Sequence, residues 1–292
     1  MESTTQYLYP RLTMYSRISG EVAFVKNISR YLKFRVRNSF IYYSTRLAFK
    51  KEGWIFSRTA CLGNDSYSRL MEKEGKEVLR LNLQKNRIES LHGSLKTKRI
   101  GLAGFRVLDR QDLLEIIWIQ HLKFWRLLPT PRYVLFDSYS ELTDQQFVFG
   151  KRTFFANYRD VKNQYLQNRK IVSVGLLDTK QISIHYKHFF DDLHRVWQDK
   201  NQFNIYFIHF PYKFERRELF ILRAKEIRTA IDELTLIYPN LISIVIPEDL
   251  VKQQINAAGI LDAFPYHFDS KAAQYVAQEI SKYEAEKQSS LT

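Results

Sequence analysis

Polar side chains suited to acid–base and nucleophilic chemistry follow several apolar segments of this sequence. The single cysteine, Cys61, adds a thiol, and Phe264-Pro-Tyr-His-Phe268 places the titratable ring of His267 among aromatic residues. The other candidates are the run Gly63, Asn64, Asp65 and Ser66, the pair Asp137 and Ser138, Tyr212 after Pro211, and Asp262. Glu141 and Asp144, which follow Asp137 and Ser138 in the sequence, are expected to be exposed to solvent.

The apolar segments themselves predict strands of a parallel sheet. Short apolar runs at 203–210 and 241–246 each stop at a proline, and similar runs occupy 53–61, 76–82 and 133–136. Apolar residues at three- and four-residue spacing predict helices at 111–127, 216–238 and 270–282. Strands that alternate with helices predict an α/β fold, a flavodoxin-like three-layer sandwich with a central parallel sheet of about five strands.

This fold decides where a ligand would bind. In an open parallel sheet, ligands bind outside the carboxyl ends of the strands, near the point where the strand order reverses. The polar candidates all follow predicted strands or precede the last helix. We therefore expect them on one rim of the sheet.

The chain divides into three parts. A basic, aromatic N-terminal segment covers residues 1–52 and is expected to be helical. The α/β domain covers 53–284, with an insertion near 147–197 that the pattern does not resolve, and 285–292 is a C-terminal tail. Residues 1–60 hold eleven Lys and Arg against three Asp and Glu, and so carry most of the formal charge of +14.

The turn after the first predicted strand and the Asp262 to His267 pair before the last helix resemble the layout of the SGNH (GDSL-type) hydrolases. By position, the resemblance implies Ser66 as nucleophile, His267 as its base and Asp262 as the residue that orients the histidine. It also implies an oxyanion hole at Gly63 and Asn64. Asp137, Ser138 and Tyr212 would contact the substrate from neighbouring loops.

The segment 58–67 also resembles the Gly-Ser-Cys turn of SGNH-like proteins found near bacterial polysaccharide genes. In that alignment Ala60 replaces the serine, so Cys61 becomes an alternative nucleophile, or the site binds without cutting. The resemblance implies an esterase or acyltransferase acting on a carbohydrate, in the synthesis of a bacterial surface polysaccharide.

Two other functions stay open at this point. One is a catalytically inactive SGNH-like subunit that binds or scaffolds. The other is a basic nucleic-acid-binding protein, which the charge and aromatic content of residues 1–52 would suit. The same segment would also suit peripheral contact with an anionic membrane surface or polymer.

No cofactor or metal is expected. The sequence lacks Gly-x-Gly-x-x-Gly after a strand and Gly-x4-Gly-Lys-Ser/Thr, and the spacing of His185, His188, Asp191 and Asp192 is a weak metal pattern without Cys pairs or HExxH. A lone cysteine and the lack of a membrane-spanning run predict a cytoplasmic protein, peripheral at the inner membrane face if the basic segment binds there.

Overall fold

The structure is a computed structural model. It describes residues 54–75, 78–92, 120, 124–150, 152–157, 161, 167, 171–197, 203–255, 259–262 and 264–291. The N-terminal segment 1–52 and most of the predicted helix 111–127 lie outside the described residues. Among the described helices, none combines the length and the apolar character needed to cross a membrane.

Five parallel strands form the central sheet in the order β2-β1-β3-β7-β8. This confirms the predicted α/β fold with a central parallel sheet of five strands. β1 and β3 are buried at every residue, which explains why they read as unbroken apolar runs. The strands are β1 (Trp54–Arg58), β2 (Leu79–Asn82), β3 (Tyr133–Asp137), β7 (Asn204–His209) and β8 (Leu241–Val245).

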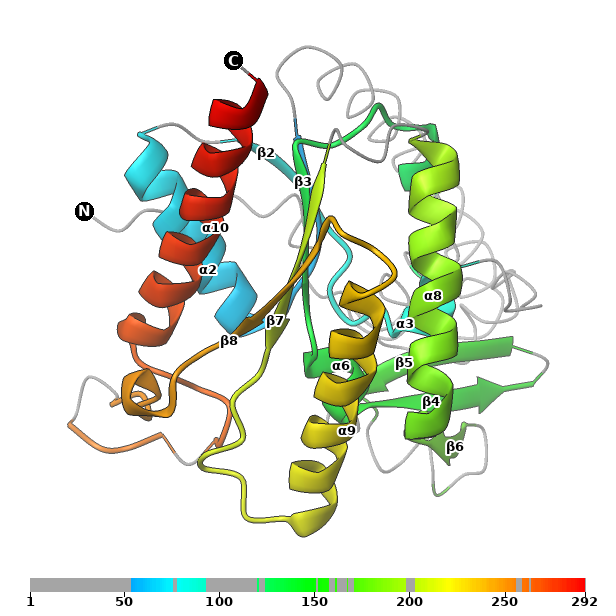
Figure 1. The fold of residues 1–292 in the computed structure, drawn as a ribbon. Helices are drawn as coiled ribbons and strands as arrows, with labels where there is room; N and C mark the ends of the chain where they lie inside the picture. The colour runs from blue at the N-terminus through cyan, green and yellow to red at the C-terminus, as the bar shows by residue number, and fades with distance from the viewer. Residues whose placement is uncertain are drawn as a thin grey trace, which may run out of the picture.

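Helices cover both faces of this sheet (Figure 1). α2 (Cys61–Glu74) packs against α10 (Ser270–Leu291) on one face, and α8 (Thr179–Val196) packs against α9 (Glu218–Thr235) on the other. The strand order reverses at β1, because β2 lies on one side of it and β3, β7 and β8 on the other. The crevice at this switch point is bounded by the residues that follow β1 and β3.

The predicted insertion contains a second, antiparallel sheet and the helix α8. The sheet has the order β5-β4-β6, with β4 (Asp144–Phe149), β5 (Arg152–Asn157) and β6 (Val172–Gly175). Short elements complete the described fold: α3 (Ile88–Leu91), η1 (Phe124–Leu127), α6 (Tyr139–Thr143) and η3 (Glu248–Leu250). α10 continues to Leu291, so residues 285–291, which the sequence analysis assigned to the C-terminal tail, are helical.

The boundary between β1 and α2 differs from the sequence prediction. β1 ends at Arg58 and α2 begins at Cys61, so Gly63 to Ser66 are helical residues and do not form a turn. α2 ends at Glu74 and is capped by Gly75, whose φ of 67° lies in the left-handed region that glycine adopts readily.

Candidate functional site

Asp137 joins the ends of β1 and β3 at the switch point. Its Oδ2 accepts a hydrogen bond of 2.6 Å from the Ala60 amide, and its Oδ1 accepts one of 3.1 Å from the Tyr139 amide. The side chain is buried, and burial raises its pKa to about 7 against the lowering effects of Arg58 and these two amides. Asp137 therefore holds the start of α2 against the β3 loop.

Gly63 allows this close approach. A Cβ at this position would lie 2.5 Å from Thr59 Cβ and Cγ2 and 3.1 Å from Asp137 Oδ2. The helix can therefore pack against the carboxylate only because residue 63 has no side chain. We expected Gly63 to lie in a loop and to contribute to an oxyanion hole. In the structure it lies in the first turn of α2, where it allows close packing.

Ser66 occupies a position that does not suit a nucleophile. Its side chain is fully buried on the inner face of α2, and its hydroxyl donates a 2.8 Å hydrogen bond to the Leu62 carbonyl one turn earlier. The expected catalytic role depended on an exposed turn, and the helix that replaces that turn directs the hydroxyl into the core.

Asn64 and Ser138 also serve the framework. Asn64 Oδ1 accepts hydrogen bonds from the hydroxyl of Thr59 at 2.9 Å and from the side chain of Asn82 at 3.1 Å, so this amide binds the β1 and β2 ends and does not face the crevice as an oxyanion donor. Ser138 is buried, and its hydroxyl accepts a 2.9 Å hydrogen bond from the Phe210 amide after β7. Tyr212 is half-buried in the loop after β7.

The structure brings Asp262 and His267 together. Asp262 Oδ2 lies 2.6 Å from His267 Nδ1, and Asp262 Oδ1 accepts a 2.8 Å hydrogen bond from the Phe264 amide. The imidazole packs edge-on against the Phe264 ring at 4.7 Å between centroids, and about a third of each polar side chain is exposed. The hydrogen bond from His267 lowers the pKa of Asp262, so an ionised carboxylate orients an accessible imidazole.

Cys61 is the first residue of α2 and contacts the segment that carries this pair. Its Sγ lies 3.8 Å from the carbonyl oxygen of Tyr266, the neighbour of His267 in sequence. Burial and the charges of Asp137 and Asp65 raise the thiol pKa to about 11, although the backbone amides of Leu62 and Cys61 act in the opposite direction. The thiol is therefore protonated at neutral pH and needs a base during any attack.

Asp65 connects the thiol and the imidazole electrostatically. It is exposed one helical turn after Cys61. Burial raises its pKa overall, against the lowering effects of Arg69 and of His267. The first turns of α2 and the segment before α10 thus place a thiol, an imidazole and two carboxylates at one edge of the crevice.

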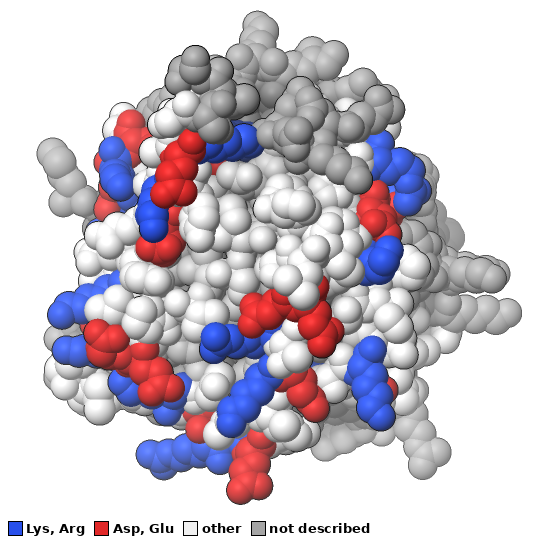
Figure 2. All heavy atoms as spheres, viewed as in Figure 1, with Lys and Arg blue, Asp and Glu red and all other residues white. Residues whose placement is uncertain are grey.

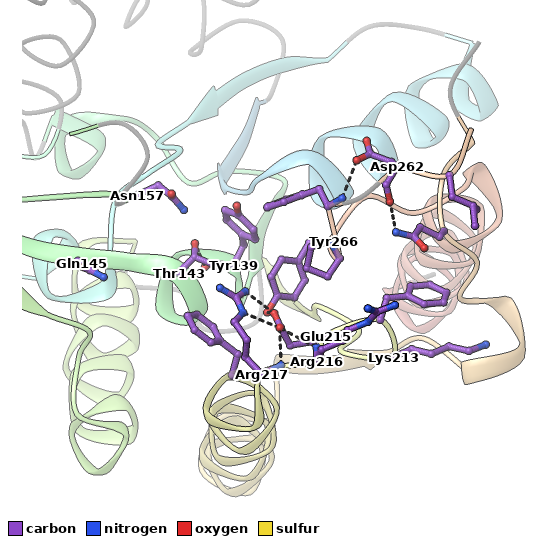
Figure 3. Close-up of a pocket in the computed structure, with 16 residues that line it drawn as sticks. Tyr139, Thr143, Gln145, Asn157, Lys213, Glu215, Arg216, Arg217, Asp262 and Tyr266 are labelled. Carbon is purple, nitrogen blue, oxygen red and sulfur yellow. Dashed lines mark hydrogen bonds and ion pairs between the residues drawn. The ribbon is translucent and has the colours of Figure 1, made fainter. Parts of the chain in front are cut away.

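A pocket of about 930 Å³ opens beside Asp262 (Figure 3). Its walls come from the β7–α9 loop, the segment before α10 and the strands β4 and β5, and neither Cys61 nor His267 is among its lining residues. The aromatic residues Tyr139, Phe264 and Tyr266 are among its lining residues, whereas Tyr67 is buried and donates to the Val78 carbonyl. The pocket is therefore a neighbour of the Asp–His pair and does not enclose it.

A buried polar cluster beneath the site was missed by sequence reasoning. Glu141 is fully buried, in contrast to the expected solvation, and its carboxylate accepts hydrogen bonds from Arg58, from Tyr186 at 2.7 Å and from the Ile88 amide at 3.0 Å. Asp144 is also buried. A charged Arg58 at the end of an apolar strand was the available signal, because such a cation needs a buried partner.

The histidines and aspartates of the weak metal pattern, at 185–192, make ring contacts, hydrogen bonds and ion pairs within the protein. His185 Nδ1 lies 2.7 Å from His92 Nε2, Asp191 accepts hydrogen bonds from Lys187 and Tyr238, and Asp192 pairs with Arg126. Within the described part of the chain, no group of three or more His, Cys, Asp or Glu side chains is arranged to hold a metal ion.

Basic and acidic side chains are interspersed on the face shown in Figure 2. Such a mixture lacks the single-sign field that favours phosphate backbones. The basic segment 1–52, from which the nucleic-acid and membrane-surface predictions came, lies outside the described residues, and these predictions stay untested.

The site and the sheet together define an α/β protein with an Asp–His pair at the switch-point edge. No protein-family model matches the sequence, and no curated protein matches it. Among solved structures, the chain is similar to a lipase from a goat rumen metagenome (8% identity, TM-score 0.39, covering 78% of this chain and 95% of the lipase).

It is also similar to an acetyl xylan esterase from the rumen bacterium Butyrivibrio proteoclasticus, with 12% identity and a TM-score of 0.38. That match covers 81% of this chain but only 64% of the esterase, less than two thirds of its length. At these identities and scores we transfer no activity from either protein.

Proposed function

We propose that this chain is an enzyme of ester chemistry, a hydrolase or acyltransferase. In this proposal Cys61 is the nucleophile, His267 is its general base and Asp262 orients His267. The observation that carries the proposal is the 2.6 Å contact between Asp262 and His267, in the segment whose Tyr266 carbonyl oxygen lies 3.8 Å from the Cys61 thiol. A carboxylate that fixes an imidazole next to a nucleophile is the arrangement that general-base activation requires.

The chemistry follows from the protonated state of the thiol. As Sγ of Cys61 attacks the ester carbonyl carbon, His267 takes the thiol proton, and it then gives that proton to the leaving alkoxide. The product is a thioester on Cys61. Water, or the hydroxyl of an acceptor, attacks this thioester with His267 again acting as base, which releases the acyl group and restores the thiol.

The amides at the start of α2 support this step. The backbone N–H groups of Cys61 and Leu62 face the sulfur and favour negative charge there. They oppose the effects of burial, Asp137 and Asp65, which keep the proton on the resting thiol. Negative charge is therefore best tolerated at this position when His267 has accepted the proton and a positive imidazolium lies nearby.

A carbohydrate substrate suits the neighbouring pocket, and a role in making a surface polysaccharide belongs to the same proposal. The pocket combines aromatic rings, which pack against the C–H faces of sugars, with amide and hydroxyl side chains, which bind sugar hydroxyls. These side chains are Tyr139, Phe220, Phe264, Thr143, Gln145 and Asn157.

The test is hydrolysis of p-nitrophenyl acetate by the wild type and by Cys61→Ala, His267→Ala and Ser66→Ala, each checked for folding by circular dichroism. Cys61→Ala and His267→Ala should lose at least about 100-fold in kcat/KM, in keeping with the loss of a nucleophile or its base. Ser66→Ala is the matched control and should retain activity, because its hydroxyl is bound inside α2.

The opposite pattern, with activity lost in Ser66→Ala and kept in Cys61→Ala, would refute our choice of nucleophile. A thioester is detected as an acyl mass on Cys61 after incubation with the ester. If the wild type neither hydrolyses the ester nor forms this thioester, the proposed enzymatic function is refuted. Since Cys61 is the only cysteine, mass spectrometry reads this site without interference.

The second candidate is a binding subunit that has lost catalysis. The raised pKa of Cys61 and the burial of Ser66 favour it, because neither group is ionised or exposed as a resting nucleophile. This candidate predicts glycan binding in the pocket with no acyl transfer by the wild type, so the acyl-mass measurement separates the two.

A further inference from the structure

The pocket beside Asp262 contains cations that the fold does not neutralise. Lys213, Arg216 and Arg217 lie together on the wall formed by the β7–α9 loop (Figure 3). A pocket wall that gathers three cations within five residues is unusual for a neutral ligand, so the partners of each cation decide what the wall attracts.

Arg217 is neutralised within the protein. Its guanidinium donates to both carboxylate oxygens of Glu215, at 2.8 Å and 2.6 Å. Burial alone would raise the pKa of Glu215, but the hydrogen bonds from Arg217 and from the Tyr266 hydroxyl hold it at about 2. The Glu215 carboxylate therefore pairs with Arg217 and Tyr266, and its side chain does not pair with the side chains of Lys213 and Arg216.

Lys213 and Arg216 have no carboxylate partner among the described residues. The ammonium group of Lys213 donates to the backbone carbonyls of Glu248 at 2.7 Å and Val251 at 3.1 Å, which fix its position but carry no net charge. The exposed Arg216 makes no side-chain hydrogen bond or ion pair within the described part of the chain. One cation is thus held in place and the other is ready to bind.

The rest of the pocket suits the uncharged part of a sugar. Figure 3 shows Gln145 and Asn157 on the side opposite Lys213, with the half-buried Tyr139 between them. A bound sugar would meet amides at one end, the Tyr139 ring along its face and cations at the other end. That order of groups predicts a ligand with hydroxyls at one end and a negative charge at the other.

We propose that this pocket binds an anionic sugar unit, one that bears a carboxylate or a phosphate, through Lys213 and Arg216. Bound there, the unit lies beside Asp262 and so presents a neighbouring acyl group to His267 and Cys61. The placement of the acyl group rests on the proposed function, whereas binding of the anionic sugar stands independently of it. Arg216 is the main specificity residue, because its planar guanidinium can bind both oxygens of a carboxylate or phosphate.

The test is isothermal titration calorimetry with three probes: a hexuronic acid tetramer, a hexose 1-phosphate and a neutral hexose tetramer. One or both anionic probes should bind at least about tenfold more tightly than the neutral tetramer, in keeping with a charge-assisted hydrogen bond. Which anion binds more tightly distinguishes a uronate from a sugar phosphate. Raising the salt from 0.05 to 0.5 M should weaken anion binding because it screens exposed cations.

Variants locate the site. Arg216→Ala and Lys213→Ala should each weaken anion binding by about tenfold, whereas Lys282→Ala, at an exposed lysine on α10, should leave it unchanged. Equal binding of the neutral and anionic probes, binding of none of them, or equal losses in all three variants would overturn the proposal.

One further variant separates this inference from the proposed function. His267→Ala removes the base but none of the pocket cations, so it should bind the anionic probe as tightly as the wild type. If the wild type binds the anionic probe but does not turn over the ester, only the proposed enzymatic function is refuted. Ester turnover with no preference for the anionic probes would refute only the anion site.

Discussion

Replacing Glu141 with Gln tests the buried cluster on which the site is built. Glu141 and Arg58 form an ion pair in which both side chains are almost completely buried. Burial alone would lower the pKa of Arg58, but the Glu141 carboxylate more than compensates, and the pKa is raised overall. A neutral glutamine therefore leaves a cation in the core without its counter-charge.

The expected loss of stability is large. Removal of one partner from a buried pair costs about 3–5 kcal/mol, because the remaining charge stays desolvated and unpaired. Glutamine also has one acceptor oxygen where the carboxylate uses two, one for the Ile88 amide and one for the Tyr186 hydroxyl. Against a typical total of about 5–15 kcal/mol, Glu141→Gln should therefore remove a large part of the free energy of unfolding at 25 °C.

Urea unfolding followed by tryptophan fluorescence measures this loss, with Glu72→Gln as the matched control. Glu72 pairs with Arg69 on the exposed side of α2, and such a pair contributes about 0.3–0.5 kcal/mol. A loss below about 1 kcal/mol for Glu141→Gln, or one no greater than that of Glu72→Gln, would refute the reasoning that the Arg58 charge is trapped in the core.

Three further predictions concern the link between Asp137 and α2. Gly63→Ala should destabilise the protein by about 1–3 kcal/mol in urea unfolding, because its Cβ overlaps Thr59, and a stabilised variant would contradict the packing. Because burial raises the Asp137 pKa from 3.8 to about 7, its folded form holds a proton that the unfolded chain releases, so its contribution to stability declines as the pH rises from about 4 to 7. The stability of the wild type relative to Asp137→Asn should therefore be greater at pH 5 than at pH 8, and a constant difference would contradict the raised pKa. Asp137→Asn should also lower the Cys61 pKa and speed its alkylation by iodoacetamide at pH 8.5, and an unchanged rate would show that the carboxylate does not act on the thiol.

The sequence predicted the sheet well because buried parallel strands leave a strong local pattern. Four of the five runs contain their strand, and β3 extends one residue beyond its run, to Asp137; the prolines at 211 and 247 stand just beyond β7 and β8. The helices 216–238 and 270–282 were found from their apolar spacing, with α9 starting and ending within three residues of the prediction. The antiparallel sheet within 147–197 was not resolved.

The first turn of α2 was misread because its cap is not local. Ala60 is the N-cap residue and has no side chain that can accept a hydrogen bond, so no Ser, Thr, Asp or Asn marks the start of the helix. Asp137, 77 positions away in sequence, accepts from the Ala60 amide instead. Without that contact in view, the segment after β1 reads as a longer strand and a polar turn, which led to Ser66 as the nucleophile.

The same non-local contact explains why the contact between Asp262 and His267 could be expected from the sequence while the surroundings of Ser66 and Cys61 could not. Asp262 and His267 are five positions apart in one segment, so their 2.6 Å contact needs only local folding. The placement of Cys61 depends on the strand order, on Asp137 and on the missing side chain of Gly63. Asp137 thus does two things at once: it fixes the start of α2, and its charge adds to the burial that raises the pKa of the Cys61 thiol. In the proposed function, such a thiol reacts only while a base takes its proton, and the paired imidazole of His267 is the base that we propose.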